Sequence, residues 1–151
     1  MHLTNLEKGQ LMTIRRCFAA TATFTGLAIA LAAPASSDMN GHYTYTETDA
    51  TGRASNSDWY VTPCGDGCVA VALTPGGPTK QAHLVNGQWA LDSTDNLECE
   101  DGTSVPNATT AHFTWDPNTL AGTVVSTDTL PVCGEQPGHQ ETNTMKLVQV
   151  P

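Results

Sequence analysis

The chain has 151 residues, of which 39% are hydrophobic and 6% aromatic, and a formal net charge of −9 at pH 7. A chain this acidic repels phosphate backbones and anionic lipid surfaces, so its composition argues against nucleic-acid binding and against electrostatic membrane binding. The acidity does not name a partner, because it is also typical of a protein that stays soluble outside the cell.

Residues 1–35 are typical of a signal peptide. Basic residues that end with Arg15-Arg16 precede an uncharged run from residue 17 to residue 33. This run is about as long as the hydrophobic region of a signal peptide, and it is too short and too rich in Ala and Thr for a good membrane span. It ends in Ala33-Pro34-Ala35, the small-x-small pattern that signal peptidase cleaves, so Ser36 is the expected first mature residue.

Two details of this segment leave alternatives open. Arg15-Arg16 fits an ordinary charged segment and also, in part, a twin-arginine signal. Met12 begins a signal of more ordinary length, so it is an alternative start to Met1. Cys17 lies at the wrong end of the uncharged run for a lipidated cysteine, and no lipoprotein is expected.

Cleavage would leave a single secreted domain, residues 36–151. Its 116 residues include three basic and fourteen acidic ones, a formal charge of −11, and they are enough for one domain with a hydrophobic core. No second apolar run of spanning length follows, so we expect no integral membrane span. Short alternating runs rich in Thr, Val, Tyr and Trp recur between turn residues, which indicates an all-β domain.

The first hairpin is expected over residues 59–73, after an opening strand at 42–48. Gly65-Asp66-Gly67 separates two alternating runs, and three turn residues with two glycines suit a tight turn. Directly opposite residues of antiparallel strands have Cα atoms about 4.5–5.5 Å apart, within the range of a disulfide. The expected register pairs Cys64 with Cys68, and it puts the pairs Val61–Val71 and Trp59–Leu73 on one apolar face.

The second hairpin is expected over residues 82–91. Asn86-Gly87 lies between two alternating runs, and this dipeptide is the strongest short-range signal of a two-residue hairpin turn. The register then pairs Leu84 with Trp89 and Ala82 with Leu91 on one face and leaves His83 on the other.

The third hairpin is expected over residues 111–124. Asp116-Pro117-Asn118 suits a type I turn with proline at its second position. A four-residue loop, 116–119, then pairs Trp115 with Leu120 and Phe113 with Gly122.

Further strands are expected at 97–100 and 144–150, which brings the total to about eight or nine. Residues 36–41 and 134–140 are expected to form loops. Because the strands follow one another in sequential hairpins, we predict an antiparallel up-and-down meander that closes into a small barrel of about eight strands. A β-sandwich is the alternative.

Four cysteines follow the signal, and an even number in a small exported domain predicts two disulfides. The hairpin register pairs Cys64 with Cys68, and the pair Cys99–Cys133 follows by elimination. The rival interpretation is a zinc or redox site. Three residues between Cys64 and Cys68 do not match the thioredoxin-like spacing, and Cys99 and Cys133 do not form a second close pair, so disulfides are favoured.

A metal site is the other chemistry that the charged residues could support. The densest acidic stretch comprises Asp92, Asp95, Glu98, Glu100 and Asp101. A calcium site needs six to eight converging oxygens, and this spacing matches no EF-hand loop, so a solvated loop is expected instead. The histidines of the mature domain, His42, His83, His112 and His139, are dispersed along the sequence, and His83 and His112 are expected at the surface. No metal and no cofactor are therefore predicted.

No nucleophile elbow, zinc-protease motif or phosphate-binding glycine loop occurs in the sequence, so no catalytic residue is assigned. Fourteen acidic residues leave room for a carboxylate pair of the kind that hydrolyses glycosides. The tryptophans, Trp59, Trp89 and Trp115, fall on the apolar faces of their hairpins. They are expected to form the core or, in a hollow barrel, to line a mouth that binds a small apolar ligand.

A distinctive order of short motifs runs along the mature domain. It comprises Gly41-His42-Tyr43-Thr44-Tyr45, Trp59, Cys64-Gly65-Asp66-Gly67-Cys68, Trp89, Cys99-Glu100-Asp101-Gly102, and Trp115-Asp116-Pro117 with Cys133 later. In this order the chain resembles a group of small secreted proteins of mycobacteria and related actinobacteria. The resemblance implies export, β-structure and two disulfides, and it implies no catalytic residue.

These features favour a secreted, disulfide-stabilised β-barrel that acts by binding and is not an enzyme. Its partner is expected to be a small apolar ligand, which requires a hollow barrel, or another extracellular protein, which requires an exposed apolar patch. The alternative is an extracellular hydrolytic enzyme with an acidic site, which requires convergent carboxylates in a cleft.

Overall fold

The computed structural model describes residues 39–151, which form eight β-strands. The predicted signal peptide, residues 1–35, lies outside the described residues. The strands are β1 (Gly41–Thr48), β2 (Ala54–Gly65), β3 (Cys68–Ala72), β4 (Thr79–Val85), β5 (Gln88–Glu98), β6 (Ser104–Trp115), β7 (Ala121–Asp128) and β8 (Gln140–Gln149). The all-β prediction is confirmed.

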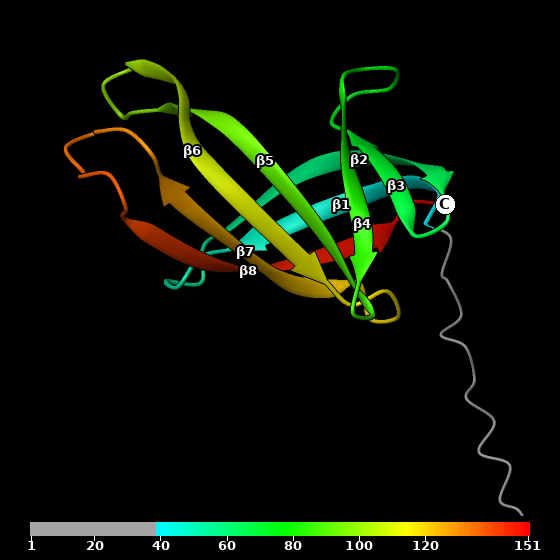
Figure 1. The fold of residues 1–151 in the computed structure, drawn as a ribbon. Helices are drawn as coiled ribbons and strands as arrows, with labels where there is room; N and C mark the ends of the chain where they lie inside the picture. The colour runs from blue at the N-terminus through cyan, green and yellow to red at the C-terminus, as the bar shows by residue number, and fades with distance from the viewer. Residues whose placement is uncertain (1–38) are drawn as a thin grey trace, which may run out of the picture. The chain divides into compact units, whose positions relative to one another are not determined.

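The strands form one closed antiparallel barrel. Each strand pairs with the next in the chain, and β8 pairs with β1 to close the ring, as Figure 1 shows. Closure leaves no free sheet edge at the seam between the first and last strands. The up-and-down barrel, and not the sandwich, is therefore the correct one of the two predicted architectures.

Alternate residues of each strand point into the barrel and form its core. Trp115 is completely buried there, and Val61 and Leu147 are each only 1% exposed. Full burial of side chains of this kind stabilises a fold by about 1.5–3 kcal/mol each. The core comprises Met39, Tyr43, Tyr45, Trp59, Val61, Val69, Val71, Ala82, Trp89, Leu91, Trp115, Met145 and Leu147.

The first hairpin keeps the predicted register only in part. Val61 pairs with Val71 as expected, but the register shifts after Pro63, so Gly65 and not Cys64 lies opposite Cys68. Gly65 adopts φ 132°, a conformation that other residues avoid, and this lets the turn tighten and leaves Cys64 as the extra residue of a bulge.

Leu73 corrects the same prediction at the other end of the hairpin. β3 ends at Ala72, and the chain then turns, with the Gly77 N–H donating to the Thr74 carbonyl at 3.0 Å. Leu73 therefore lies outside the strand ladder and is 64% exposed, where the sequence placed it on the buried face opposite Trp59.

The second hairpin is confirmed in every predicted pair. Leu84 lies opposite Trp89 and Ala82 opposite Leu91. Asn86 and Gly87 adopt φ 51° and 81°, the two positive values that a type I′ turn requires.

The third hairpin was predicted two residues out of register. Trp115 pairs with Gly122, and Phe113 pairs with Val124. The paired residues Trp115 and Gly122 enclose six residues and not four, since Asp116 donates its N–H to the Ala121 carbonyl at 3.0 Å. Leu120 adopts φ 56° within this turn and donates its N–H to the Asp116 carbonyl at 2.9 Å. A Cβ at Gly122 would lie 1.8 Å from the Thr114 carbonyl oxygen, so only glycine fits opposite Trp115.

The hairpin of β5 and β6 is longer than predicted. The separate strand expected at 97–100 does not exist, since β5 continues to Glu98 across a register shift between Asp95 and Leu97. Asn107 on β6 adopts φ 52° at this irregularity and donates its N–H to Asn96 Oδ1 at 3.0 Å. The last strand, β8, also begins four residues before the predicted position, at Gln140.

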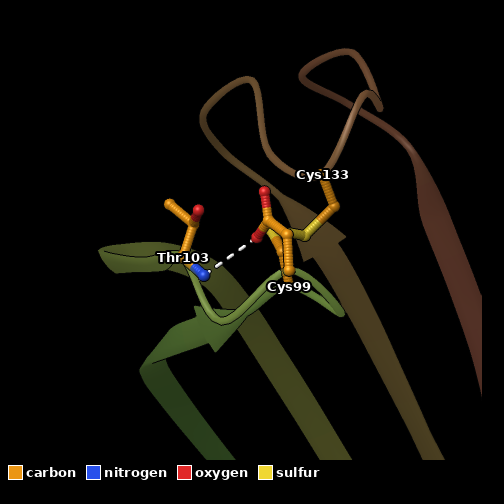
Figure 2. The surroundings of a disulfide bond; sticks show 4 residues. Cys99, Thr103 and Cys133 are labelled. Carbon is orange, nitrogen blue, oxygen red and sulfur yellow. Dashed lines mark hydrogen bonds between the residues drawn. A yellow bond between two sulfur atoms is a disulfide. The ribbon is translucent and has the colours of Figure 1, made fainter.

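Both predicted disulfides are present, and the topology puts them at opposite ends of the barrel. Cys64–Cys68 joins β2 to β3, with Cα atoms 5.1 Å apart. Cys99–Cys133 joins the β5–β6 loop to the β7–β8 loop, with Cα atoms 5.3 Å apart (Figure 2). Disulfides are typical of proteins in an oxidising compartment, which is consistent with an extracellular location.

Candidate functional site

A cavity of about 450 Å³ lies inside the barrel, toward the end that carries the β3–β4 loop. Its size is within the range of small-molecule pockets. The residues that line it come from six strands and the β3–β4 loop: Tyr45, Glu47, Ser57, Trp59, Val71, Leu73, Thr74, Pro78, Thr79, Lys80, Leu91, Ser93, Asp95 and Phe113.

Three aromatic rings form one wall of this cavity. Tyr45 and Trp59 stack with their centroids 4.8 Å apart and their planes within 2° of parallel. Phe113 meets both rings edge-on, at 6.1 Å from Tyr45 and 5.8 Å from Trp59. Aromatic pairs of this kind contribute about 0.5–1.5 kcal/mol each beyond the burial of their surface, which favours this arrangement of the wall.

Polar side chains also point into the barrel at this end. Ser57 lies opposite Tyr45, and Lys80 lies opposite Val71, yet both are exposed because the cavity is open to solvent. Asp95 accepts hydrogen bonds from Lys80 Nζ at 2.6 Å and from Ser93 Oγ at 2.5 Å.

The Lys80–Asp95 pair bridges a gap between two strands. The ladder of β4 and β5 ends at the pair Ala82–Leu91, and Thr79–Gln81 pair only with β3. Burial raises the pKa of Asp95, but the hydrogen bonds of Lys80 and Ser93 and the charge of Lys80 lower it by more, so its net pKa lies below the usual value. Asp95 is therefore ionised at neutral pH and its charge is balanced by Lys80.

Glu47 is the second carboxylate of the cavity. The Tyr45 hydroxyl donates to Oε2 and the Asn143 amide nitrogen donates to Oε1, each at 2.7 Å. Burial, with the hydrogen bond and the charge of Glu47, raises the pKa of Tyr45, so its phenol keeps its proton as the donor. Glu47 also lines an adjoining hollow of about 280 Å³, together with Asp49, Arg53, Ala54, Ser55, Glu141 and Asn143.

All three tryptophans that the sequence singled out belong to the core, and of these only Trp59 also lines the cavity. Trp115 meets Trp59 edge-on at 5.7 Å and stacks with Trp89 at 6.3 Å. The Trp115 indole N–H donates to Met39 Sδ at 3.3 Å, and the Trp89 indole nitrogen is buried without a partner. Tyr45, Glu47 and the Lys80–Asp95 pair were not predicted as site residues, although alternation along β1 places Tyr45 and Glu47 on one face.

Only part of the acidic stretch forms the solvated loop that was predicted for it, since Glu100 and Asp101 are exposed in the β5–β6 loop. Asp92, Asp95 and Glu98 lie in β5, where Asp92 points outward and pairs with His112 at 2.6 Å. His83 and His112 are exposed, as predicted. Within residues 39–151, no group of three or more His, Cys, Asp or Glu side chains is arranged to hold a metal ion.

A further hollow of about 470 Å³ lies over β5–β8, and we place the candidate site elsewhere. Most of its lining residues point outward, among them Asp92, Thr94, His112 and Thr127. It has no aromatic wall, so it offers a ligand little apolar surface to bury.

No family model, curated protein or solved structure matches this chain. Among the described residues, no helix has the length and apolar character to cross a membrane.

Proposed function

We propose that this protein is secreted and binds a small, largely apolar ligand inside its barrel. The observation that carries the proposal is the cavity of about 450 Å³ with its aromatic wall of Tyr45, Trp59 and Phe113. An eight-stranded barrel is just wide enough to hold one small ligand. Apolar walls with a few polar groups are the usual composition of small-molecule sites.

Secretion is supported by two independent features. The small domain carries two disulfides, which persist in oxidising compartments. Residues 1–35 have the sequence of a signal peptide. The proposal therefore groups the chain with the small secreted actinobacterial proteins that its motif order resembles.

The contacts of the two cavity carboxylates favour binding over hydrolysis. Glu47 is held by Tyr45 and Asn143, and Asp95 is held by Lys80 and Ser93. A general acid must instead keep its proton near neutral pH, and the lowered pKa of Asp95 works against that role. A carrier is expected to release any glycoside unchanged, whereas a hydrolase would turn it over and lose that activity in Glu47→Gln.

The exposed apolar side chains give less support to a protein partner. The large ones are Leu73, Val85, Leu130 and Val148. Leu73 and Leu130 lie at one end of the barrel and Val85 and Val148 at the other, and the two members of each pair are on opposite sides of the ring. Single exposed apolar residues are normal on a protein surface and do not mark a docking patch. We therefore propose a small ligand as the partner.

The experiment is native mass spectrometry of the protein after incubation with a lipid or metabolite extract. Ser57→Phe would place a ring in the cavity, and Asn56→Phe would place the same ring on the outer face of the same strand. We expect the unmodified protein and Asn56→Phe to retain a small-molecule mass and Ser57→Phe to lose it. Absence of any retained mass, or equal retention by both variants, would contradict binding in this cavity.

A further inference from the structure

We infer that the ligand of this cavity is an organic cation, an amine on an apolar body, and this inference rests on the proposed function. Three observations lead to it: an unbalanced carboxylate, a buried acceptor without a partner, and the aromatic wall beside them.

The first observation concerns charge. The cavity is lined by three ionisable side chains, Glu47, Lys80 and Asp95, in addition to the phenol of Tyr45. Lys80 and Asp95 pair with each other at 2.6 Å, so their charges cancel. Glu47 takes part in none of the ion pairs found among residues 39–151, and both of its partners are neutral donors. The cavity therefore has a net negative charge that is centred on Glu47.

The second observation is the amide of Asn143, which is only 8% exposed. Its nitrogen must face Glu47, because a carboxylate accepts hydrogen bonds and cannot donate them. Its Oδ1 is buried and has no hydrogen-bond partner. A buried acceptor without a partner is costly, so this oxygen calls for an N–H or O–H donor.

The third observation is where these groups lie. Glu47 lines both the main cavity and the smaller hollow that contains Asn143. A ligand ammonium beside Glu47 can donate to the carboxylate at the junction of the two spaces, and it reaches Asn143 Oδ1, which has almost no accessible surface, only if the Asn143 side chain turns toward it. The apolar body of such a ligand would then extend along Tyr45, Trp59 and Phe113, whose rings also attract cations through their π faces. An anion would meet the uncompensated charge of Glu47, and a neutral apolar ligand would leave the charge unmatched.

The test compares three ligands of one shape by titration calorimetry: 4-phenylbutylamine, 4-phenylbutan-1-ol and 4-phenylbutyrate. We expect the amine to bind about tenfold more tightly than the alcohol, since both can donate a hydrogen bond to Glu47 but only the ammonium adds an attraction between opposite charges. The butyrate is expected to bind most weakly. Salt gives a check without any substitution, because about 0.5 M salt should weaken the amine and leave the alcohol nearly unchanged.

Glu47→Gln removes the charge and keeps the size of the side chain. It should weaken the amine about tenfold and change the alcohol by less than about twofold. Glu98→Gln is the matched control, because it changes the net charge equally at an exposed position of β5 away from the cavity. The control should bind all three ligands as the unmodified protein does.

The outcomes separate this inference from the proposed function. Equal or tighter binding of the alcohol or the butyrate by the unmodified protein would overturn the cation and leave cavity binding intact. If none of the three binds while an extract still gives a retained mass, the ligand class is again wrong. If no ligand and no extract component binds, the proposed function falls together with the inference.

Discussion

Removal of each disulfide in turn tests how the barrel is stabilised. Cys64–Cys68 closes a loop with a sequence separation of 4, and Cys99–Cys133 closes one with a separation of 34. If a disulfide acts by restricting the unfolded chain, the short loop contributes about 2 kcal/mol and the long loop about 4 kcal/mol. We expect Cys99→Ala with Cys133→Ala to lower the free energy of unfolding about twice as much as Cys64→Ala with Cys68→Ala.

The assay is equilibrium unfolding in urea, followed by the fluorescence of the buried tryptophans. With an m value of about 1–3 kcal/mol per molar urea, the larger loss moves the midpoint by about 1.3–4 M. The ratio of the two midpoint shifts does not depend on the m value, provided that m is the same in both variants. Far-ultraviolet circular dichroism at zero urea should show the same β-structure in each variant.

Equal shifts, or a larger shift for Cys64–Cys68, would refute the reasoning from loop length. The bulged hairpin would then owe its stability to contacts within the folded state, where Cys64 occupies the extra position between Pro63 and Gly65. The long loop carries no such bulge at its cysteines, since Cys99 and Cys133 lie in two different connections at one end of the barrel (Figure 2).

Three further predictions concern single residues. Gly122→Ala should destabilise the protein by about 1–3 kcal/mol or more, because its Cβ would meet the backbone of Thr114 and Trp115. A loss of less than about 0.5 kcal/mol in urea unfolding would contradict this. Trp115→Ala should cost about 3–5 kcal/mol of unfolding free energy. Trp59→Ala should cost less, because the space that it leaves joins an existing cavity. A lower thermal midpoint for Trp59→Ala than for Trp115→Ala would show that the cavity is filled. Asp95→Asn should flatten the acid side of the curve of unfolding free energy against pH. The lowered pKa of Asp95 gives stability that is present above about pH 4 and is lost as the pH falls through its folded-state pKa. The loss should be less than about 1 kcal/mol because the side chain is 50% exposed, and identical slopes for the variant and the unmodified protein between about pH 5 and about pH 2 would refute the prediction.

The parts of the fold that sequence predicts correctly are those set by neighbouring residues. Asn86-Gly87 fixes both the turn and the pairing of Leu84 with Trp89, because only two residues have to adopt positive φ. The third hairpin fails for a related reason. Leu120 adopts φ 56° although leucine rarely does, and its carbonyl accepts the Leu147 N–H from β8 at 2.8 Å. This contact with a distant strand keeps Leu120 in the turn, and Gly122 takes its predicted place opposite Trp115. No local signal in the sequence indicates the contact.

The disulfides show how a correct prediction can rest on a partly wrong register. Cys64 was placed directly opposite Cys68, and the bulge moves Gly65 to that position. The pair still forms, because the one-residue shift leaves the two Cα atoms 5.1 Å apart, which is within the range of a disulfide. The elimination that assigns Cys99 to Cys133 needs only the first pairing and not its register.

The candidate site is harder to predict, because strand alternation tells which face a residue is on but not how deep it lies along the barrel axis. Trp59 and Trp115 point inward by the same rule and meet edge-on in the core, yet only Trp59 also lines the cavity. Depth depends on how all eight strands are staggered around the ring, and each register error shifts that stagger.

The same geometry explains why polar residues can occupy inward positions without penalty. At the end where β4 and β5 separate, Lys80 and Asp95 point inward and remain partly hydrated, so neither has to bear the full cost of a buried charge. At the other end, an inward charge would displace the packing of Trp89 and Trp115 and would have no partner. An inward polar residue in this barrel therefore identifies the open end. Glu47 is the one cavity carboxylate without a cationic partner among residues 39–151. It therefore identifies the position within the open end at which a ligand's charge can be bound.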